Sequence, residues 1–369
     1  MGFFNRRTQP AANGNGTVPA AGEKHGRHHH EPYSTSRRPT FGQWLKGTWL
    51  DLLTMVVLGA VGLGVYYAPP APTRSFAVQF ADGEVVYPQF AYPLRKEIIP
   101  IWLAAFLASV IPIFIMLLMQ IRIRSFWDFN NAVLGLLYSL ITAAVFQVFI
   151  KWLIGGLRPH FLDVCKPDIS KLQGLGNNGL NRVGYDSIYF TREICTGDKD
   201  EIDDSLESMP SGHATAAFAG FIFLYLYLNA KLKVFSNYHP SLWKLAVTYM
   251  PVLGACLIAG ALTIDEFHHW YDVLAGGIIG TVMAFSAYRM TFAAVWDWRY
   301  NHIPLNRNAP FSYGELAGGT FTRKAGWGGM DGRGASNGVS NGYHHNGNVV
   351  GNGAMHGGVG PSTRGDNMV

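Results

Sequence analysis

Six long apolar segments decide what this chain can fold into. Each holds roughly 20 residues with few charges, the length that an α-helix needs to cross the hydrocarbon core of a bilayer. A soluble helical protein with buried helices is the alternative, but one soluble core does not need six such segments. We therefore predict an all-α, polytopic membrane protein with six transmembrane helices in one bundle. The segments are Trp49–Tyr67, Ile98–Gln120, Ala132–Leu157, Ser211–Leu228, Leu242–Ile264 and Tyr271–Phe292.

The basic residues outside these segments predict how the helices are oriented. Loops rich in Lys and Arg face the cytosol, and four basic groups alternate as this rule requires. Both termini are then cytosolic, with Arg74, Arg95 and Lys96 in the first outer loop as a modest exception. The four groups are Arg6, Arg7, Lys24, Arg27, Arg37, Arg38 and Lys46 before the first helix, Arg122 and Arg124 after the second, Lys231 and Lys233 after the fourth, and Arg289 and Arg299 at and beyond the end of the sixth.

The two ends of the chain differ in composition from its centre. We expect a disordered basic cytosolic arm at 1–45, a membrane domain at 46–298 and a disordered Gly/Asn/His-rich cytosolic tail at 299–369. The arm lacks the apolar run of a secretory signal, so the first membrane helix is expected to act as the signal-anchor. The arm is either solvated or in contact with anionic lipid headgroups. Nothing in the composition indicates nucleic-acid binding, and a homo-oligomer is left open.

The third apolar segment ends in a basic stretch. Lys151 and Arg158 are seven residues apart, which places them on one face of a helix, and Pro159 predicts that this helix stops near Arg158. A lysine within an apolar segment is costly and marks a candidate functional site. The alternative is a lysine that extends its amine to the membrane interface. We favour the functional interpretation because Arg158 and Pro159 follow the lysine.

The fourth apolar segment opens with Pro210-Ser211-Gly212-His213. Ser211 suits a helix N-cap, and Gly212 lets an anion approach the backbone closely. A helix N-terminus also offers free N–H groups and the positive end of its dipole. His213 would stand in the first turn, directed at the same point. The alternative is an ordinary capped helix with His213 at the interface.

His268 and Asp272 lie four residues apart at the start of the sixth segment. In a helix they would face each other, and a carboxylate beside an imidazole fixes its tautomer and raises its basicity. This arrangement prepares a histidine as a nucleophile or base. The predicted topology places all three stretches on the same, non-cytosolic side of the membrane. We therefore expect one site for a phosphate, with acid–base groups, that faces a lumen or the exterior.

The longest loop, residues 159–209, lies on that same side and contains Cys165 and Cys195. A non-cytosolic loop permits a disulfide. The sequence leaves open whether these two cysteines are bonded to each other or are free thiols.

The three stretches together resemble the type 2 phosphatidic acid phosphatase (PAP2) superfamily, the lipid phosphate phosphatases. The first motif of that family, Lys-x6-Arg-Pro, is matched by Lys151, Arg158 and Pro159. The second, Pro-Ser-Gly-His, is matched by Pro210–His213. The order, the spacing and the six helices also match, over about residues 45–295. The resemblance implies a six-helix membrane bundle of the PAP2 type.

The third motif of the family, Ser-Arg-x5-His-x3-Asp, is matched only in part. His268 and Asp272 match, but Ala261 and Leu262 occupy the Ser and Arg positions. The missing arginine removes a charge-assisted hydrogen bond of about 1.5–3 kcal/mol. The chain is then a slower enzyme, an enzyme with a replacement cation, or a non-catalytic relative. The retention of both histidines and Asp272 favours an active hydrolase.

The resemblance also implies the roles of the site residues. His268 would attack phosphorus and form a phosphohistidine, Asp272 would orient it, and His213 would protonate the leaving oxygen and then activate water. The phosphoryl oxygens would be held by Lys151, Arg158, Ser211 and the backbone of Gly212. These residues contain no acidic cluster for magnesium, so a reaction without metal or cofactor follows.

The expected function is a membrane lipid phosphate phosphatase acting on phosphatidate, diacylglycerol pyrophosphate or a related lipid. Its partners would be the lipid phosphate substrate and the bilayer. A phosphatase for a sugar or polyprenyl phosphate is a second reading. A non-catalytic or weakly active lipid-binding relative is a third, and Leu262 is its best support. A transporter is disfavoured because the charges gather at one face and not at the bilayer midplane.

Overall fold

A computed structural model describes residues 38–69, 75–79, 84–168, 189–307, 311 and 313, and six long helices are its main elements. All six are long and apolar enough to cross a membrane, so the predicted all-α, six-span fold is confirmed. The expected arm and tail lie mostly outside these residues. The long helices are α1 (Phe41–Tyr66), α2 (Ile101–Ile123), α3 (Phe126–Leu153), α6 (Gly212–Leu232), α7 (Leu242–Ile264) and α8 (Trp270–Thr291).

The first helix begins eight residues earlier than its apolar segment predicts, at Phe41. Thr40 and Gln43 explain the difference, because they form a reciprocal capping box. The Thr40 hydroxyl accepts from the Gln43 N–H at 3.4 Å, and the Gln43 side chain accepts from the Thr40 N–H at 3.1 Å. Such a cap starts a helix in polar sequence, where hydropathy gives no signal.

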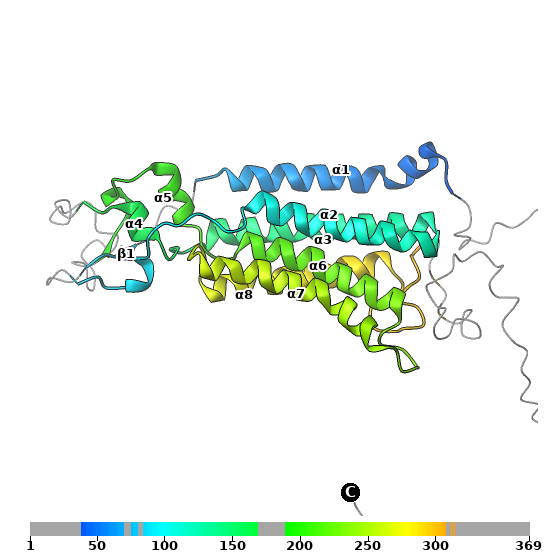
Figure 1. Cartoon of the computed structure of the whole chain (residues 1–369). Coiled ribbons are helices and arrows are strands. Elements are labelled where there is room, and N and C mark those ends of the chain that lie inside the picture. Colours follow the sequence, from blue (N-terminus) through cyan, green and yellow to red (C-terminus); the bar gives the residue numbers. More distant parts are fainter. Residues whose placement is uncertain are drawn as a thin grey trace, which may run out of the picture. The chain divides into compact units, whose positions relative to one another are not determined.

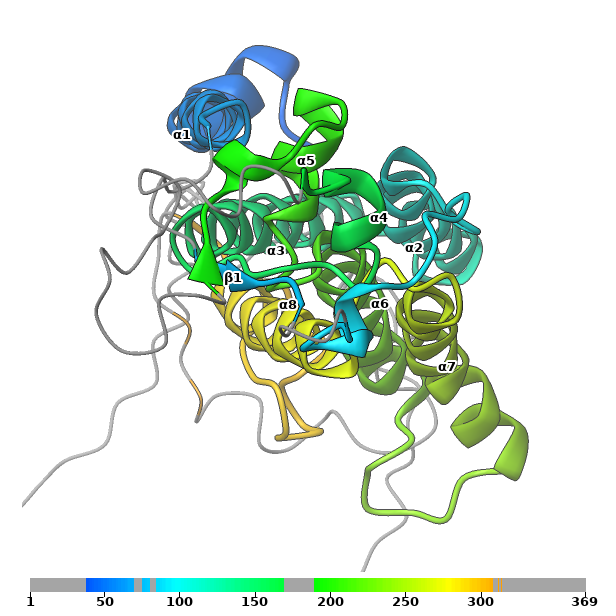
Figure 2. The same ribbon diagram turned by 90° about the vertical axis from the view of Figure 1, so that its left-hand side faces the viewer.

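Helix α6 is the central element of the bundle. It packs against α2, α3, α7 and α8 and is almost wholly buried (Figures 1 and 2). Helix α1 packs mainly on α3 and exposes most of its apolar surface, as a lipid-facing helix does. The buried position of α6 matters because its two ends carry the two main polar clusters of the protein.

Two glycines of α8 let that helix lie directly against α6. A Cβ atom on Gly276 would come within 2.5 Å of the Ser211 carbonyl oxygen, and one on Gly280 within 2.5 Å of the Thr215 carbonyl oxygen. Any residue larger than glycine would clash with the α6 backbone at either position. Small residues at a helix crossing permit this close backbone approach, and here it brings the start of α8 to the start of α6.

A small domain, here called the cap, covers the end of the bundle at which α3 stops and α6 begins (Figure 1). It contains a two-stranded antiparallel sheet with its own apolar core around Phe161 and Ile194, and a Cys165–Cys195 disulfide closes it. The sequence had left this disulfide open. The elements of the cap are β1 (Phe76–Ala77), η1 (Pro88–Phe90), α4 (Phe161–Cys165), β2 (Tyr189–Phe190), η3 (Arg192–Ile194) and α5 (Lys199–Ser205).

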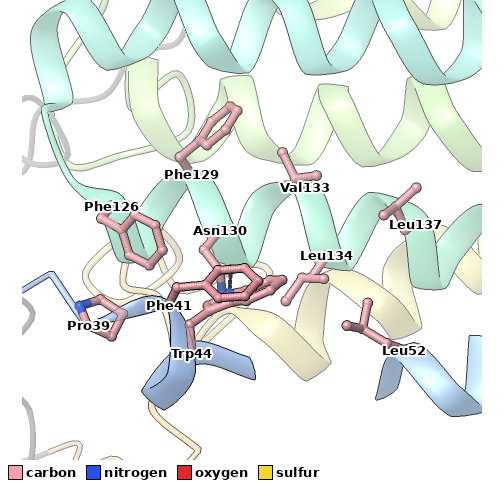
Figure 3. A pocket seen from close by; sticks show the side chains of 10 residues that line it. All are labelled: Pro39, Phe41, Trp44, Leu52, Phe126, Phe129, Asn130, Val133, Leu134 and Leu137. Atoms are coloured by element: carbon pink, nitrogen blue, oxygen red, sulfur yellow. Dashed lines mark hydrogen bonds between the residues drawn. The ribbon is translucent and has the colours of Figure 1, made fainter. Parts of the chain in front are cut away.

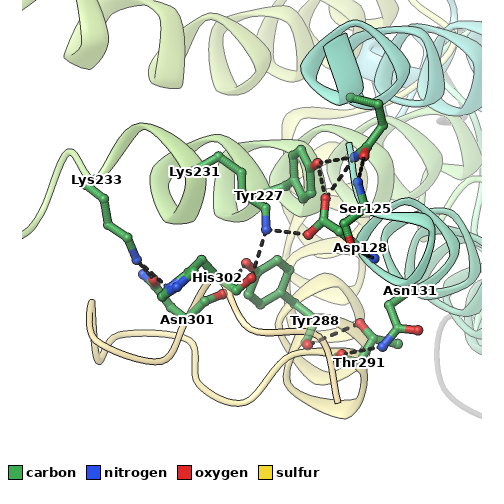
Figure 4. A network of polar contacts seen from close by, with 11 residues as sticks. Ser125, Asp128, Asn131, Tyr227, Lys231, Lys233, Tyr288, Thr291, Asn301 and His302 are labelled. Atoms are coloured by element: carbon green, nitrogen blue, oxygen red, sulfur yellow. Dashed lines mark hydrogen bonds and ion pairs between the residues drawn. The ribbon is translucent and has the colours of Figure 1, made fainter. Parts of the chain in front are cut away.

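The opposite end of the bundle holds a buried polar cluster, here called the far-end network (Figure 4). Lys231 donates to Asp128 and, at 2.8 Å, to the His302 carbonyl oxygen. Residues 299–305, which the sequence assigns to the tail, pack here against α3, α6 and α8. The network consists of Asp128, Tyr227, Lys231, Lys233, Asn301 and His302.

Candidate active site

The third stretch of the site, His268–Asp272, differs from its predicted geometry. Helix α8 begins at Trp270 with His269 as its N-cap, so His268 precedes the helix and the predicted i, i+4 pair within one helix is wrong. Asp272 instead closes a capping box by accepting from the His269 N–H at 3.0 Å. The turn still directs the His268 ring at this carboxylate: Nδ1 of His268 lies 3.6 Å from Oδ2 of Asp272.

His268 is held rigidly and kept neutral. Its backbone N–H donates to the Leu262 carbonyl oxygen at 3.1 Å, and its side chain is only 3% exposed. Burial lowers the pKa of His268 to about 3, although Asp272 acts in the opposite direction. The ring is therefore uncharged at neutral pH. Because Nδ1 faces Asp272, Nε2 is the nitrogen that can react with a substrate.

The second stretch, Pro210–His213, forms the start of α6, as predicted. Ser211 is the N-cap, and its hydroxyl accepts from the Ala214 N–H at 3.4 Å. The Ser211 N–H donates to the Asp272 carbonyl oxygen at 3.0 Å, which fastens the second stretch to the third. His213 is in the first turn, and a contact joins its ring to the Ile99 carbonyl. The free N–H groups at Gly212 and His213 thus lie beside the third stretch.

The first stretch, Lys151–Pro159, also differs from its predicted geometry. Helix α3 ends at Leu153, so Lys151 and Arg158 do not share a helix face. Gly155 (φ +48°) and Gly156 (φ +110°) adopt positive φ angles that favour glycine and end the helix early. They turn the chain so that the Arg158 N–H donates to the Ser205 carbonyl oxygen at 2.8 Å.

Arg158 is buried at the junction of the cap and the bundle. Its Nη2 donates to Oδ1 of Asp204 at 2.6 Å, and its guanidinium carbon lies 5.7 Å from the centre of the Phe267 ring. The Asp204 side chain is half exposed. Lys151, in the last turn of α3, is also buried. The charges of both Arg158 and Lys151 lower the pKa of His268, so the first stretch lies close enough to the third to act on it.

The site contains buried polar atoms without partners. Within the described residues, four such atoms belong to it: Nε of Arg158, Nε2 of His213, Nδ1 of His268 and Oδ1 of Asp272. A buried polar atom without a hydrogen bond costs about 1–3 kcal/mol, so it is retained where a ligand or a reaction uses it. Donors from the first and second stretches, beside a neutral histidine, suit a tetrahedral anion.

Comparison with known proteins identifies the family of the chain. The sequence profile of the PAP2 superfamily matches residues 132–296. A protein of Arabidopsis thaliana named lipid phosphate phosphatase 2 is 33% identical over 68% of this chain and 78% of its own length. The chain belongs to the PAP2 superfamily.

Two other relatives of this PAP2 protein are similar over comparable lengths. Diacylglycerol pyrophosphate phosphatase 1 of Saccharomyces cerevisiae is 30% identical over 67% of this chain and 80% of its own length. A PA-phosphatase related-family protein of Dictyostelium discoideum is 33% identical over 70% of this chain and 66% of its own length. No solved structure gives a significant match.

Leu262 is the point at which this PAP2 protein departs from the third motif. Its side chain is fully buried, and its carbonyl oxygen accepts from the N–H groups of Phe267 and His268 at 3.2 and 3.1 Å. The backbone of this position therefore still places His268. The side chain is apolar and supplies no cation.

Sequence reasoning missed several residues of the site. The Ser208 hydroxyl donates to Oδ2 of Asp272 at 2.5 Å, and Asp204 pairs with Arg158. Ser208 lies two residues before the second stretch, so its position beside that stretch was a usable signal. Asp204 is one of several acidic residues around α5, and nothing in the sequence separates it from the others.

An apolar pocket of about 530 Å³ lies elsewhere, between the first turns of α1 and α3 (Figure 3). Its lining includes Trp44, whose indole N–H donates to Oδ1 of Asn130 at 2.7 Å. None of the side chains that line it is titratable. The side chains of this pocket therefore offer no acid, base or charged group for catalysis.

Proposed function

We propose that this protein is a membrane lipid phosphate phosphatase that hydrolyses phosphomonoesters such as phosphatidate, or the terminal phosphate of diacylglycerol pyrophosphate. The observation that carries the proposal is the group of four unpartnered buried atoms on Arg158, His213, His268 and Asp272. The printed names of two relatives, a lipid phosphate phosphatase and a diacylglycerol pyrophosphate phosphatase, support the substrate class. A site that adjoins the bilayer favours lipids over soluble sugar phosphates.

In the proposed mechanism, cations and backbone N–H groups hold the phosphate. Lys151 and Arg158 neutralise its charge, and the N-terminus of α6, at Ser211 and Gly212, donates to its remaining oxygens. Such preorganised donors provide most of the stabilisation in phosphoryl transfer. The negative charge of the bound phosphate also favours a proton on the nearby His213.

The chemistry proceeds in two displacements. In the first, the lone pair on Nε2 of His268 attacks phosphorus, and the bond to the lipid oxygen breaks while that oxygen takes the proton of His213. In the second, His213 accepts a proton from water, the water oxygen attacks phosphorus, and the P–N bond breaks to release inorganic phosphate. Asp272 beside Nδ1 stabilises the positive charge on the phosphorylated ring. No redox partner or metal is needed.

The test is phosphate release from purified protein in detergent. Phosphatidate, diacylglycerol pyrophosphate, lysophosphatidate and a polyprenyl phosphate are offered in the presence of EDTA. Wild type should release phosphate from at least the first two, and His268→Ala should release none, because no other group can carry the phosphoryl group. His239→Ala, an exposed histidine beyond α6, is the control. Activity in His268→Ala equal to that of wild type would refute the mechanism.

A non-catalytic lipid-phosphate-binding relative is the second candidate, and the buried apolar side chain of Leu262 favours it. Binding of a phosphate analogue separates the two. Vanadate that binds wild type while no substrate in the panel is hydrolysed would support the second candidate.

We also propose that the cap faces the lumen or the exterior and that both termini are cytosolic. The Cys165–Cys195 disulfide supports this orientation, because disulfides persist in oxidising compartments. Lys199→Cys in the cap and His239→Cys at the opposite end are matched exposed positions in a Cys256→Ala background. In sealed cells, an impermeant maleimide should label only Lys199→Cys. Labelling of His239→Cys alone would reverse the orientation.

A further inference from the structure

One backbone segment contacts the first two stretches of the site and the end of α7, just before the third, and no sequence pattern predicted these contacts. Residues 92–99, here called the strap, join η1 to α2. The Tyr92 N–H donates to the Pro159 carbonyl oxygen at 3.1 Å, in the first stretch. At the other end, the Ile99 carbonyl contacts the His213 ring in the second stretch. Most side chains of the strap are exposed, so backbone contacts hold it, together with Arg95, whose Nε lies 3.5 Å from Oε2 of Glu266.

Two carboxylates anchor the strap from the outside. Oδ2 of Asp163 accepts from the Leu94 N–H at 2.9 Å, and Oδ2 of Asp265 accepts from the Ile98 N–H at 3.2 Å. The second anchor is one residue from the carbonyl that contacts His213, whereas the first is five residues away. Asp265 ends α7, three residues before His268. It therefore connects the turn before the third stretch, through the strap, to the histidine of the second.

We propose that Asp265 is a positioning residue for His213, which it orients through the Ile98 N–H and the Ile99 carbonyl of the strap. This inference rests on the proposed function, in which His213 gives its proton to the leaving oxygen. A ring held on one side by a backbone carbonyl presents its opposite side to the substrate in a fixed direction. Without the Asp265 anchor, the end of the strap would move, and His213 would lose that direction.

The inference predicts an effect that depends on the leaving group. When phosphatidate is cleaved, the leaving oxygen becomes the hydroxyl of diacylglycerol and must receive a proton as its bond to phosphorus breaks. When diacylglycerol pyrophosphate is cleaved, the leaving group is phosphatidate, whose phosphate oxygen is a far weaker base and leaves without full protonation. Damage to His213 therefore slows the first reaction more than the second. Damage to the nucleophile, His268, slows both.

The experiment compares kcat/KM for these two lipids with identical acyl chains. Asp265→Ala should lower the value for phosphatidate by roughly 10- to 100-fold, part of the usual contribution of a general acid, and that for diacylglycerol pyrophosphate by less than about 3-fold. Asp265→Asn keeps an oxygen that can accept from the Ile98 N–H and should restore the ratio. Asp163→Ala, which removes the distant anchor of the same strap, should leave the ratio at its wild-type value.

Equal losses on both lipids in Asp265→Ala would overturn the inference, because Asp265 would then act through His268 or through folding. Its Oδ1 does accept from the Phe267 N–H at 3.3 Å, but that N–H also donates to the Leu262 carbonyl oxygen at 3.2 Å. Hydrogen exchange gives a readout without activity. Asp265→Ala should speed exchange at the Ile98 amide, and unchanged protection there overturns the inference. If wild type hydrolyses neither lipid, the proposed function fails, while the exchange result still decides whether Asp265 anchors the strap.

Discussion

The two ends of α6 carry buried polar clusters of similar composition that differ in how many of their polar atoms have hydrogen-bond partners. At the far end, the Lys233 amine contacts the Trp298 carbonyl oxygen, Oδ1 of Asn301 and Nδ1 of His302, and Asp128 accepts from Lys231 and Tyr227 (Figure 4). Every buried side-chain atom of this network has a partner among the described residues. At the other end, four buried atoms have none within that same part of the chain.

Burial and charge alone would have selected the wrong cluster as readily as the right one. Lys231 and Asp128 are each 2% exposed, as deeply buried as His268 and Asp272. A fully paired network stabilises one structure, whereas unpaired buried groups cost free energy unless a ligand or a reaction uses them. The difference between the clusters therefore supports a structural role for the far-end network and the proposed chemical role for the other cluster.

The largest effect should follow from removing the nucleophile. His268→Gln should lower turnover of phosphatidate by at least about 10³-fold, as loss of a covalent nucleophile does. It should change the unfolding free energy by less than about 1 kcal/mol, because Nδ1 has no hydrogen bond among the described residues to lose. Steady-state kinetics and thermal unfolding in the same detergent measure both. A large loss of stability would mean that the site is a structural cluster like the far-end network.

The converse change removes a charge at the far end. Lys231→Met leaves Asp128 buried without its cation and should destabilise the fold by about 3–5 kcal/mol. Turnover per folded molecule should stay at the wild-type value. The double variant Lys231→Met with Asp128→Asn should recover part of the stability, and Lys46→Met, an exposed lysine, is the control. Lost turnover in a stable Lys231→Met protein would contradict a purely structural network.

A third prediction concerns the departure from the family motif. Leu262→Arg places a charge at a fully buried apolar position and should cost about 3 kcal/mol of stability, with a fall in activity. Leu262→Met conserves volume and should cost less than about 1.5 kcal/mol. Kinetics and thermal unfolding of both variants beside wild type decide. Faster turnover in Leu262→Arg without a loss of stability would mean that the site has room for the missing cation.

The smallest effect is the contribution of His302 to acid sensitivity. Burial holds the pKa of His302 well below its ordinary value of 6.5, so the folded protein keeps this ring neutral while the unfolded chain protonates it. The free energy of unfolding is therefore unaffected by this ring above pH 6.5. Below that value it falls, by up to about 1.4 kcal/mol per pH unit. Melting temperatures at pH 7.5 and 5.5 test this. The melting temperature of His302→Gln should fall less on acidification than that of wild type, and an equal fall would contradict the prediction.

Hydropathy predicted the six helices because bilayer thickness imposes their length, and the predicted topology placed the three stretches at one end of the bundle. The sequence did not predict the path between them. The early end of α3 depends on positive φ angles at Gly155 and Gly156, and a glycine pair also occurs within ordinary membrane helices. The start of α8 at Trp270, after His268, depends on a cap made by Asp272, which had been assigned only a chemical role. Contacts made by backbone atoms, such as those of the strap, leave no residue pattern to read.

Helix α6 also fixes a length. His213 and Lys231 are 18 residues apart on it, which corresponds to about 27 Å of helix, close to the ~30 Å hydrocarbon thickness of a typical bilayer. Four neighbouring helices surround α6, so it cannot tilt by itself to suit a thicker or thinner membrane. The bilayer must adjust around the protein instead. Under the proposed function, membrane thickness therefore sets the depth at which a lipid headgroup meets His268, and the same chain would receive its substrate differently in membranes of different thickness.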